Sequence, residues 1–514
     1  MINGLDSKVL RLETINPHVV NIEYAVRGPI VQRALQIEEA LKKGEKRNFK
    51  EVIKCNIGDC HATGQKPLTF CRQIMAMLAF PELENDERFP DDVKQRARRI
   101  LQSCGGGSVG SYSNSLGIQC IREDVASYIE RRDGIPSNSA DVFLASGATE
   151  AIKLIFFLQY ILHLISTGED GNRRAGVMVP IPQYPLYSAT NAEMNAYQIE
   201  YYLEEANNWA LNIRELERAL RASDGCCVPR ALVVINPGNP TAQVLSRSCM
   251  EDVIRFAYDN RLVLLADEVY QFNIYQPRAC PWTSFKRVLH DMGPPYATGV
   301  ELASFMSCSK GFLGECGFRG GYCELVNFDP AVANQLYKAL SARLCPPVIG
   351  QAMVAALVDP PTESEPSYAL FIQERDRVLE DLRIKADLVT RTLNSLPGVT
   401  CNPIQGAMYA FPRIELPPKA VLAAKEQGQQ PDFFYCLQFL EEKGVCVVPG
   451  SGFGQAEGTF HFRCGVLVVF NFLYRSLARS FPTRYNDQLV WWKLEGVLPP
   501  SYFRAICVCF ATCN

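Results

Sequence analysis

From about residue 140, short apolar runs alternate with helical patterns along the chain. Runs of Val, Ile, Leu and Ala predict strands, and helical patterns such as 214–223 and 248–260 separate several of them. Strands that are apolar almost throughout, with helices between them, are typical of a mostly parallel sheet covered on both faces. The predicted strands are DVFLASG (141–147), GVMVPIPQY (176–184), ALVVINP (231–237), LVLLADEVY (262–270) and ELASFMS (301–307).

Two helices are predicted before this block. Residues 33–43 have apolar positions at helical spacing and are followed by Gly44, a helix stop. Residues 90–107 begin with proline and two aspartates, carry arginines and a lysine in later turns, and end in glycines, as the helix macrodipole favours. Residues 149–166 predict a helix directly after the first strand; their apolar run 155–165 is shorter than the roughly 18 residues of a membrane span.

After about residue 365 the pattern changes to a long predicted helix at 375–396, then a helix at 433–444 and a strand at 445–450. The length of 514 residues favours a large domain of about 250–300 residues plus a smaller one. We predict an N-terminal arm with part of the small domain (1–70), a large domain (71–365), a small domain (366–463) and an atypical tail (464–514).

Composition excludes several classes of partner. The net charge of −3 gives no electrostatic reason to expect nucleic acid or an anionic membrane, and five histidines make a histidine-based metal site improbable. The 20 cysteines include no CxxC pair, and the N-terminus lacks the features of a signal or transit peptide, so we expect reduced thiols and a cytoplasmic protein. A misplaced start site would leave a mitochondrial location open.

One lysine has unusual surroundings. Lys310 follows an apolar strand inside SFMSCSKGFLGECGFRGGY, between serines and glycines. The hydroxyls of Ser307 and Ser309 and the guanidinium of Arg319 suit a phosphate, and glycines let backbone approach a ligand closely. An amine beside a phosphate site is what an enzyme needs to hold a phosphorylated aldehyde covalently. We therefore prefer this interpretation to that of a solvated surface lysine.

Pyridoxal 5′-phosphate is such an aldehyde, and its other needs have candidates at neighbouring strand ends. Its ring nitrogen calls for a carboxylate, for which Asp267 is placed. Its ring oxygen calls for donors, for which Tyr270 and Asn239 are candidates, although Asn239 also suits a turn. Its phosphate favours a helix N-terminus, as predicted at Ala148 and Thr149, and Tyr184 could cover the ring.

The chain resembles the fold type I pyridoxal-phosphate aminotransferases, and within them it is similar to the alanine aminotransferases of animals. The resemblance runs from about residue 15 to residue 463. It rests on EYAVRGPIVQRA, CNIGDCHATGQKPLTF, SCGGGSVGSYSNSLG, PIPQYPLYSA, INPGNPT, LLADEVYQ, SKGFLGECGFRGGY, LCPPV, QGAMYAFPRI, VVPGSGFG and FHFR.

The resemblance implies a role for each matching position. Lys310 would bind the cofactor aldehyde and then carry a proton, and Asp267 would pair with the ring nitrogen. Arg463 would bind the substrate α-carboxylate with help from the Gly58 amide, although an arginine on the alternating strand FHFR would otherwise be expected to be exposed. The remaining assignments are Tyr270 and Asn239 to the ring oxygen, Tyr184 to the ring face, Ala148, Thr149, Ser307, Ser309 and Arg319 to the phosphate, and Tyr112 to the phosphate of a second subunit.

The implied reaction transfers the amino group of L-alanine to 2-oxoglutarate, giving pyruvate and L-glutamate. It would proceed by a ping-pong mechanism through pyridoxamine phosphate, in a homodimer with shared active sites. Burial is expected to lower the pKa of Lys310, which would keep its amine competent as a base near neutral pH.

The chain departs from the family pattern at three places. It has alanine at position 242 in NPTAQ, where glycine is usual, and SFMSCSK has Met306 and Cys308 where histidine and threonine are usual. After Arg463 the family continues into an amphipathic helix, whereas residues 464–514 lack that pattern and end in a cysteine-rich apolar run, which predicts an alternative or mis-predicted C-terminal end.

Two other functions remain open at this point. A pyridoxal-phosphate lyase related to aminocyclopropane-carboxylate synthase shares the Lys, Asp, Tyr and Asn set. A splice isoform could fold its large domain, bind cofactor and dimerise, yet fail to close over the substrate, because Arg463 lies next to the atypical tail.

Overall fold

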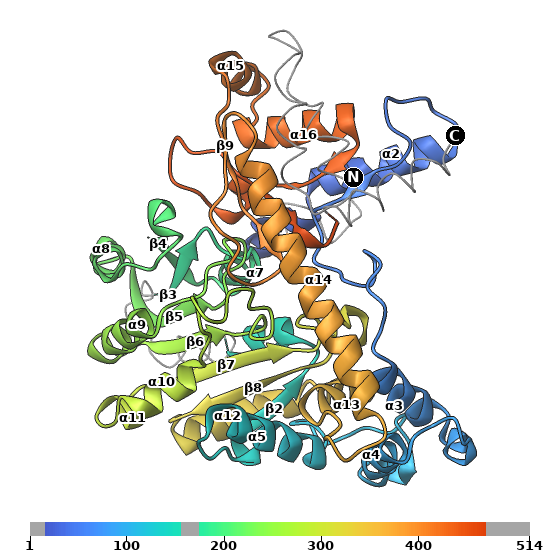
Figure 1. Ribbon diagram of the computed structural model, residues 1–514. Coiled ribbons are helices and arrows are strands. Elements are labelled where there is room, and N and C mark those ends of the chain that lie inside the picture. The colour runs from blue at the N-terminus through green and yellow to red at the C-terminus, as the bar shows by residue number, and fades with distance from the viewer. Residues whose placement is uncertain (1–15, 156–173, 469–514) are drawn as a thin grey trace, which may run out of the picture.

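The computed structural model describes residues 16–155 and 174–468 (Figure 1). The apolar run 155–165, apart from Ile155, and the tail beyond residue 468 lie outside the described residues, so the predictions made for them stay predictions. Within the described residues, no helix is both long and apolar enough to cross a membrane.

A seven-stranded sheet in the order β2-β8-β7-β6-β5-β3-β4 forms the lower part of the molecule (Figure 1). All neighbouring strands among β4, β3, β5, β6 and β7 are parallel, and only β8 runs against its two neighbours. The prediction of a mostly parallel sheet is confirmed. Its strands are β2 (Val142–Ala145), β3 (Arg174–Ile181), β4 (Tyr197–Tyr202), β5 (Cys227–Ile235), β6 (Val263–Asp267), β7 (Leu302–Ser307) and β8 (Gly321–Val326).

Two of these strands were not expected from the sequence. β4 reads YQIEYY, which has few aliphatic residues because it is the edge strand and pairs only with β3. β8 starts inside the glycine-rich segment that follows Lys310. A Cβ on Gly321 would come within 2.9 Å of backbone atoms of Gly147, Met306 and Ala148, so glycine here allows close packing of β8 between β2 and β7.

Both faces of the sheet are buried, as β5 illustrates. Leu232 and Val234 point to one face and pack with side chains of α8, α9 and α10, whereas Val233 and Ile235 point to the other and pack with those of α7 and α12. Burial on both faces explains why β5 is apolar at successive positions. At the β2–β8 end of the sheet, a further cluster is formed by α3, α4, α5 and α13.

The main helices of this lower part are α3 (Thr69–Ala79), α4 (Asp91–Gln102), α5 (Gln119–Asp133), α7 (Leu186–Glu193), α8 (Ile213–Ala222), α9 (Arg247–Asp259), α10 (Phe285–Asp291), α12 (Pro330–Ser341) and α13 (Val348–Val358). The predicted helices 214–223 and 248–260 correspond to α8 and α9. The glycines at 105–107 form a short turn after α4, so that helix ends earlier than the predicted residue 107.

The upper part contains α15 (Pro418–Glu426), α16 (Pro431–Lys443) and short strands, and α14 (Tyr368–Asn394) runs from it down to the sheet (Figure 1). The N-terminal segment packs here as well, because α2 (Pro29–Lys42) contacts α16 and β1 (Ile53–Lys54) pairs with β12 (Val445–Cys446). Two small sheets complete the upper part. In one, β9 (Val399–Thr400) pairs with β11 (Arg413–Ile414). In the other, β14 (Phe462–Gly465) pairs with both β10 (Tyr409–Ala410) and β13 (Val448–Pro449).

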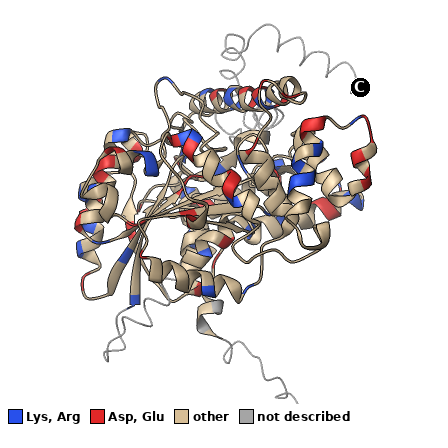
Figure 2. Cartoon of the chain, turned by 90° about the horizontal axis from the view of Figure 1, so that it is seen from below, with Lys and Arg blue, Asp and Glu red and all other residues tan. Residues whose placement is uncertain are grey.

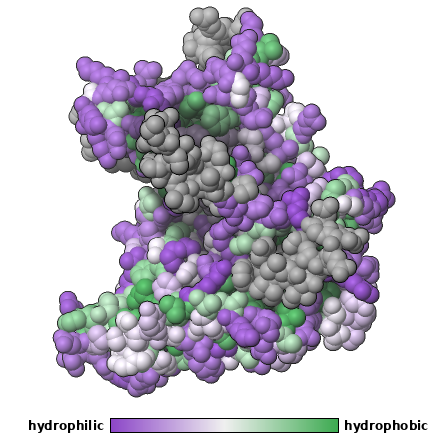
Figure 3. Space-filling model, turned by 180° about the vertical axis from the view of Figure 1, so that it is seen from behind, coloured by the Kyte–Doolittle hydropathy of each residue, from purple (hydrophilic) through white to green (hydrophobic). Residues whose placement is uncertain are grey.

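In the view from below, Lys, Arg, Asp and Glu residues are spread over the outer helices in both signs (Figure 2). Seen from behind, the surface is largely hydrophilic, and hydrophobic side chains gather mainly over the lower part (Figure 3). No large face of one sign stands out in these views, in keeping with the net charge of −3.

Ala242, the departure within NPTAQ, has a backbone conformation that favours glycine. Its φ is +63°, in the left-handed region, which costs a residue with a Cβ about 1–2 kcal/mol. The Ala242 carbonyl accepts hydrogen bonds from the N–H groups of Gln405 and Gly406, and these contacts hold the strained conformation in place. The departure therefore carries a backbone cost although it removes no polar group.

Replacing a side chain in the middle of the sheet tests the packing of both faces. Leu232→Ala in β5, whose side chain is fully buried, is expected to lower the free energy of unfolding by about 2–5 kcal/mol because it leaves a cavity. The matched control Leu422→Ala, on an exposed position of α15, should change it by less than about 0.5 kcal/mol. Denaturant unfolding measures both values, and an equal loss of unfolding free energy in the two variants would contradict the described core.

Candidate active site

A cavity of ≈ 590 Å³ opens where the carboxyl ends of the central strands meet the N-terminal segment and the upper part. Every predicted site residue except Tyr112 contributes to its lining: Gly58, Ala148, Thr149, Tyr184, Asn239, Asp267, Tyr270, Ser307, Ser309, Lys310, Arg319 and Arg463. Tyr112 is 79% exposed and lies outside the cavity of its own chain.

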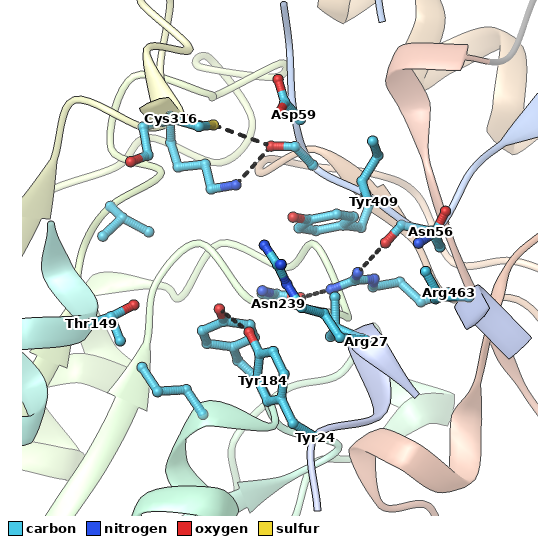
Figure 4. A pocket seen from close by; sticks show the side chains of 18 of the residues that line it. Tyr24, Arg27, Asn56, Asp59, Thr149, Tyr184, Asn239, Cys316, Tyr409 and Arg463 are labelled. Atoms are coloured by element: carbon cyan, nitrogen blue, oxygen red, sulfur yellow. Dashed lines mark hydrogen bonds between the residues drawn. The ribbon is translucent and has the colours of Figure 1, made fainter. Parts of the chain in front are cut away.

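Lys310 lies on the loop that follows β7, and its Nζ donates a hydrogen bond to the Gly58 carbonyl at 2.9 Å. Gly58 has no room for a side chain, since an added Cβ would lie 2.1 Å from the Tyr409 hydroxyl and 3.1 Å from Lys310 Nζ. The Cys316 thiol lies 3.8 Å from the same Gly58 carbonyl (Figure 4), and it donates to the Ser309 carbonyl at 3.1 Å. Glycine at position 58 thus lets the N-terminal segment approach the amine.

The expectation that burial lowers the pKa of Lys310 is wrong in its net direction. Burial does act to lower that pKa, but the Tyr409 hydroxyl, followed by the Cys316 and Cys60 thiols, raises it, and the net shift is upward. In return, the Lys310 amine and the Arg463 guanidinium lower the pKa of Tyr409 against the effect of its burial. The amine and the phenol therefore stabilise each other's charged forms.

Asp267 is the last residue of β6 and is almost completely buried. Its Oδ2 accepts a hydrogen bond from the Tyr187 hydroxyl at 2.9 Å, and no ion pair to it occurs among the described residues. Burial raises the pKa of Asp267 to about 6, although the hydrogen bonds from Tyr187 and from the Val269 N–H and the charge of Lys310 lower it. A carboxyl group held in this way is prepared for a cationic partner in the cavity.

The opposite end of the cavity is built for an anion. A helix begins at Ala148, directly after Gly147, whose φ of +78° and missing Cβ leave space for the Arg319 guanidinium. Arg319 donates to the Ser146 carbonyl at 2.9 Å and so lies over this helix start. The Ser309 hydroxyl is buried and has no hydrogen-bond partner in the described residues. A helix N-terminus, an arginine and an unused hydroxyl together fit a phosphate.

Arg463 lies on β14 and is 1% exposed, so the expectation of an exposed residue on an alternating strand is wrong. Its Nη1 donates to Asn239 Oδ1 at 3.2 Å and its Nη2 to the Asn56 carbonyl at 2.7 Å (Figure 4). The guanidinium stacks on the ring of Tyr409, 4.1 Å from its centroid. Within the described residues it has no carboxylate partner and its Nε has no acceptor, which leaves it able to bind an anionic ligand.

Four residues that contribute to the site were not identified from the sequence: Tyr24, Asn56, Tyr187 and Tyr409. The Tyr24 hydroxyl forms a hydrogen bond with that of Tyr184 at 2.7 Å (Figure 4), and the Tyr270 hydroxyl donates to that of Tyr409 at 3.3 Å. Tyr187 follows Tyr184 by three residues in PQYPLY and lies in the first turn of α7, so its closeness in sequence to Tyr184 is the signal that could have indicated it.

A buried carboxylate anchors the loop that carries Lys310. Glu315 receives two hydrogen bonds from Arg72 of α3, at 2.8 and 2.9 Å, and lies 3.5 Å from His61 Nε2. His61 belongs to the same N-terminal segment as Gly58, so these contacts join the two segments on either side of the Lys310 amine. A loop rich in glycine is thereby held in one position.

A doubly covered α/β sheet with a buried amine, a buried carboxyl and an anion site at one edge is typical of the pyridoxal-phosphate transferases. Residues 79–466 match the family model of the aminotransferases of class I and II, and the chain belongs to that family.

Within this family, the chain is highly similar in sequence to proteins named as alanine aminotransferases. The chain is 58% identical over 466 residues to alanine aminotransferase 1 of Bos taurus and to that of Homo sapiens, alignments that cover 90% of this chain and 92% of each relative. It is 46% identical to a probable mitochondrial alanine aminotransferase of Dictyostelium discoideum, covering 89% of this chain and 85% of the relative. An alanine aminotransferase structure from Pyrococcus furiosus shares the fold, with a TM-score of 0.69 and 23% identity over 90% of this chain and 97% of that one.

The raised pKa of Asp267 predicts a pH-dependent stability cost in the cofactor-free protein. The unfolded carboxyl ionises near pH 4 and the folded one near pH 6, so stability falls as pH rises between them, by about 3 kcal/mol in total. Asp267→Asn cannot ionise, so its stability relative to wild type should increase from pH 4 to pH 6 and then stay constant. Chemical denaturation across this range measures the difference. A difference that does not change between pH 4 and pH 6 would contradict the burial cost.

Proposed function

We propose that the chain transfers the amino group of L-alanine to 2-oxoglutarate, giving pyruvate and L-glutamate, with pyridoxal 5′-phosphate as its cofactor. The observation that carries this proposal is the cavity in which the Lys310 amine, the buried Asp267 carboxyl and the buried Arg463 guanidinium come together. The name shared by the relatives at 56–58% identity supports alanine as the amino donor.

The lining residues fit this cofactor at both ends. Arg319, Ser307, Ser309 and the helix start at Ala148 and Thr149 would hold the phosphate, where the Ser309 hydroxyl has no hydrogen-bond partner in the described part of the chain. Asp267 would hold the ring nitrogen, and Tyr270 and Asn239 the ring oxygen. Asn239 uses its Oδ1 to accept from Arg463, so its amide N–H groups remain to donate. Tyr184, held by Tyr24, would cover the ring.

When bound, pyridoxal phosphate supplies an electrophilic aldehyde carbon and an electron sink for the reaction. The chain's own residues supply the binding and the proton transfer. Lys310 would hold the aldehyde covalently at rest. Once the amino group of the substrate has replaced it there, the freed amine would take the proton from the Cα atom of the amino acid and deliver it to the cofactor in the same half-reaction. The Gly58 carbonyl accepts a hydrogen bond from this amine and orients it, and the Tyr409 hydroxyl raises the pKa of the amine.

Arg463 binds the α-carboxylate that all four substrates and products share. Its guanidinium is already fixed by Asn239, Asn56 and the Tyr409 ring, so little conformational entropy is lost on binding. Burial of the arginine makes this site selective for carboxylates, because a ligand without one would leave the charge unpaired. The Gly58 amide is proposed to assist from the N-terminal segment.

We also propose a homodimer in which Tyr112 reaches the phosphate site of the second subunit. Tyr112 is 79% exposed in its own chain, which is unusual for a large aromatic side chain and leaves it available to a partner. The cytoplasm is our proposed compartment, on the grounds of the sequence alone. The division into domains at residues 70, 365 and 463 likewise stays a proposal.

Lys310→Ala tests the central assignment. We expect transamination between L-alanine and 2-oxoglutarate to fall by about 10³-fold or more, because the residue that transfers the proton is lost. The absorbance of covalently held cofactor should also disappear. The control Lys338→Ala, on an exposed position of α12, should keep both signals. Full activity of Lys310→Ala would refute the assignment.

Mixing two inactive variants tests the shared active site. Chains with Tyr112→Ala and chains with Lys310→Ala are each expected to be impaired as homodimers. In hybrid dimers with shared sites, one site carries both changes and the other none, so random mixing should restore about a quarter of wild-type activity. Activity no greater than the sum of the two separate variants would show that Tyr112 does not act across subunits.

A further inference from the structure

We propose that Arg27 binds the second carboxylate of 2-oxoglutarate and L-glutamate. The inference rests on the proposed function, in which one site must accept alanine, with a methyl side chain, and glutamate, with a side chain that ends in a negative charge. A distal carboxylate in a cavity needs a cation that is not already committed to another group.

Most of the cationic side chains that line the cavity already have a hydrogen-bond or ion-pair partner. Lys310 donates to the Gly58 carbonyl, and Arg319 lies over the helix start at the phosphate end. Arg463 is fixed between Asn239 and Asn56, where the α-carboxylate is placed. The lysine that remains, Lys54, forms an ion pair with Glu38 at 2.9 Å.

Arg27 is the cation that is left in this lining. Its guanidinium has no hydrogen-bond or ion-pair partner among the described residues, and Figure 4 shows the side chain extending into the cavity. Its backbone is fixed, because Arg27 ends a helical turn after Tyr24 and its N–H donates to the Tyr24 carbonyl at 3.1 Å. Arg27 therefore lies on the turn that directly follows Tyr24, the residue whose hydroxyl bonds to Tyr184.

The acidic residues of the cavity do not neutralise Arg27. Asp267 accepts its hydrogen bonds from Tyr187 and Val269, and Asp59 Oδ1 accepts one from the Ala62 N–H at 3.0 Å. Neither forms an ion pair with Arg27 in the described part of the chain. Apolar side chains of Val31, Leu35 and Ile57 line the same cavity and suit the methylene groups of a five-carbon substrate.

The difference in exposure between the two arginines explains how one site accepts both substrates. Arg463 is buried, so every substrate must supply it with a carboxylate. Arg27 is exposed to solvent, so water can solvate its charge when alanine leaves it without a partner. An exposed arginine therefore adds affinity for the dicarboxylates without excluding alanine.

Separate measurement of the two half-reactions tests the inference. For Arg27→Gln, kcat/KM for L-glutamate and 2-oxoglutarate should fall by about 10- to 100-fold, as for loss of one charge-assisted hydrogen-bonded pair. The values for L-alanine and pyruvate should fall by at most about 3-fold. Arg27→Lys, which keeps the charge, should recover part of the loss for the dicarboxylates.

Ligand binding gives a readout that does not depend on turnover. Glutarate, which has two carboxylates and no amino or oxo group, should bind the wild-type holoenzyme more tightly than butyrate in calorimetry, and Arg27→Gln should remove this difference. Lys54→Gln serves as the matched control because Lys54 lines the same cavity but pairs with Glu38, and it should leave the preference intact.

Two results would overturn the role of Arg27 while the proposed function stands: an equal fall in both half-reactions, or a loss of glutarate preference in Lys54→Gln and not in Arg27→Gln. Wild-type enzyme that converts neither alanine nor glutamate would overturn the proposed function and this inference with it.

Discussion

The arrangement of the site depends on a buried positive charge, the guanidinium of Arg463, which joins three parts of the chain. The arginine comes from β14 in the upper part, its acceptor Asn239 follows strand β5 of the large sheet, and its other acceptor is the Asn56 carbonyl of the N-terminal segment. A buried charge without a carboxylate partner in the described residues is costly, and under the proposed function a substrate would supply the missing anion. The proposal therefore couples substrate binding to the closeness of the three parts.

Other groups around the cavity also reduce the stability of the folded chain. Asp267 is held where burial raises its pKa to about 6, the Ser309 hydroxyl is buried without a partner in the described residues, and Ala242 has a left-handed backbone. Each lowers the stability of the folded chain by itself. The large, doubly covered sheet provides the burial that offsets these costs, and the polar groups can then be fixed in advance for ligands rather than for one another.

The parts of this site that could be predicted from the sequence follow one rule. Lys310 and Asp267 come directly after apolar strands, and the carboxyl ends of parallel strands meet at one edge of the sheet. Asn56 had no such signal, because it contributes a backbone carbonyl that any residue could supply. Tyr409 lies in an apolar run that resembles core, and its effect on the pKa of Lys310 appears only when the upper part is folded against the sheet. Local patterns thus miss residues whose contribution depends on segments far apart in the sequence.

Isotope transfer tests the central claim, that this cavity moves an amino group from alanine to a 2-oxo acid. Purified protein would be incubated with pyridoxal phosphate, ¹⁵N-labelled L-alanine and 2-oxoglutarate, and the products followed by mass spectrometry. The account predicts ¹⁵N-glutamate and pyruvate in equal amounts. Pyruvate accompanied by ¹⁵N-ammonium, as a lyase would produce, or no transfer of label at all, would contradict it.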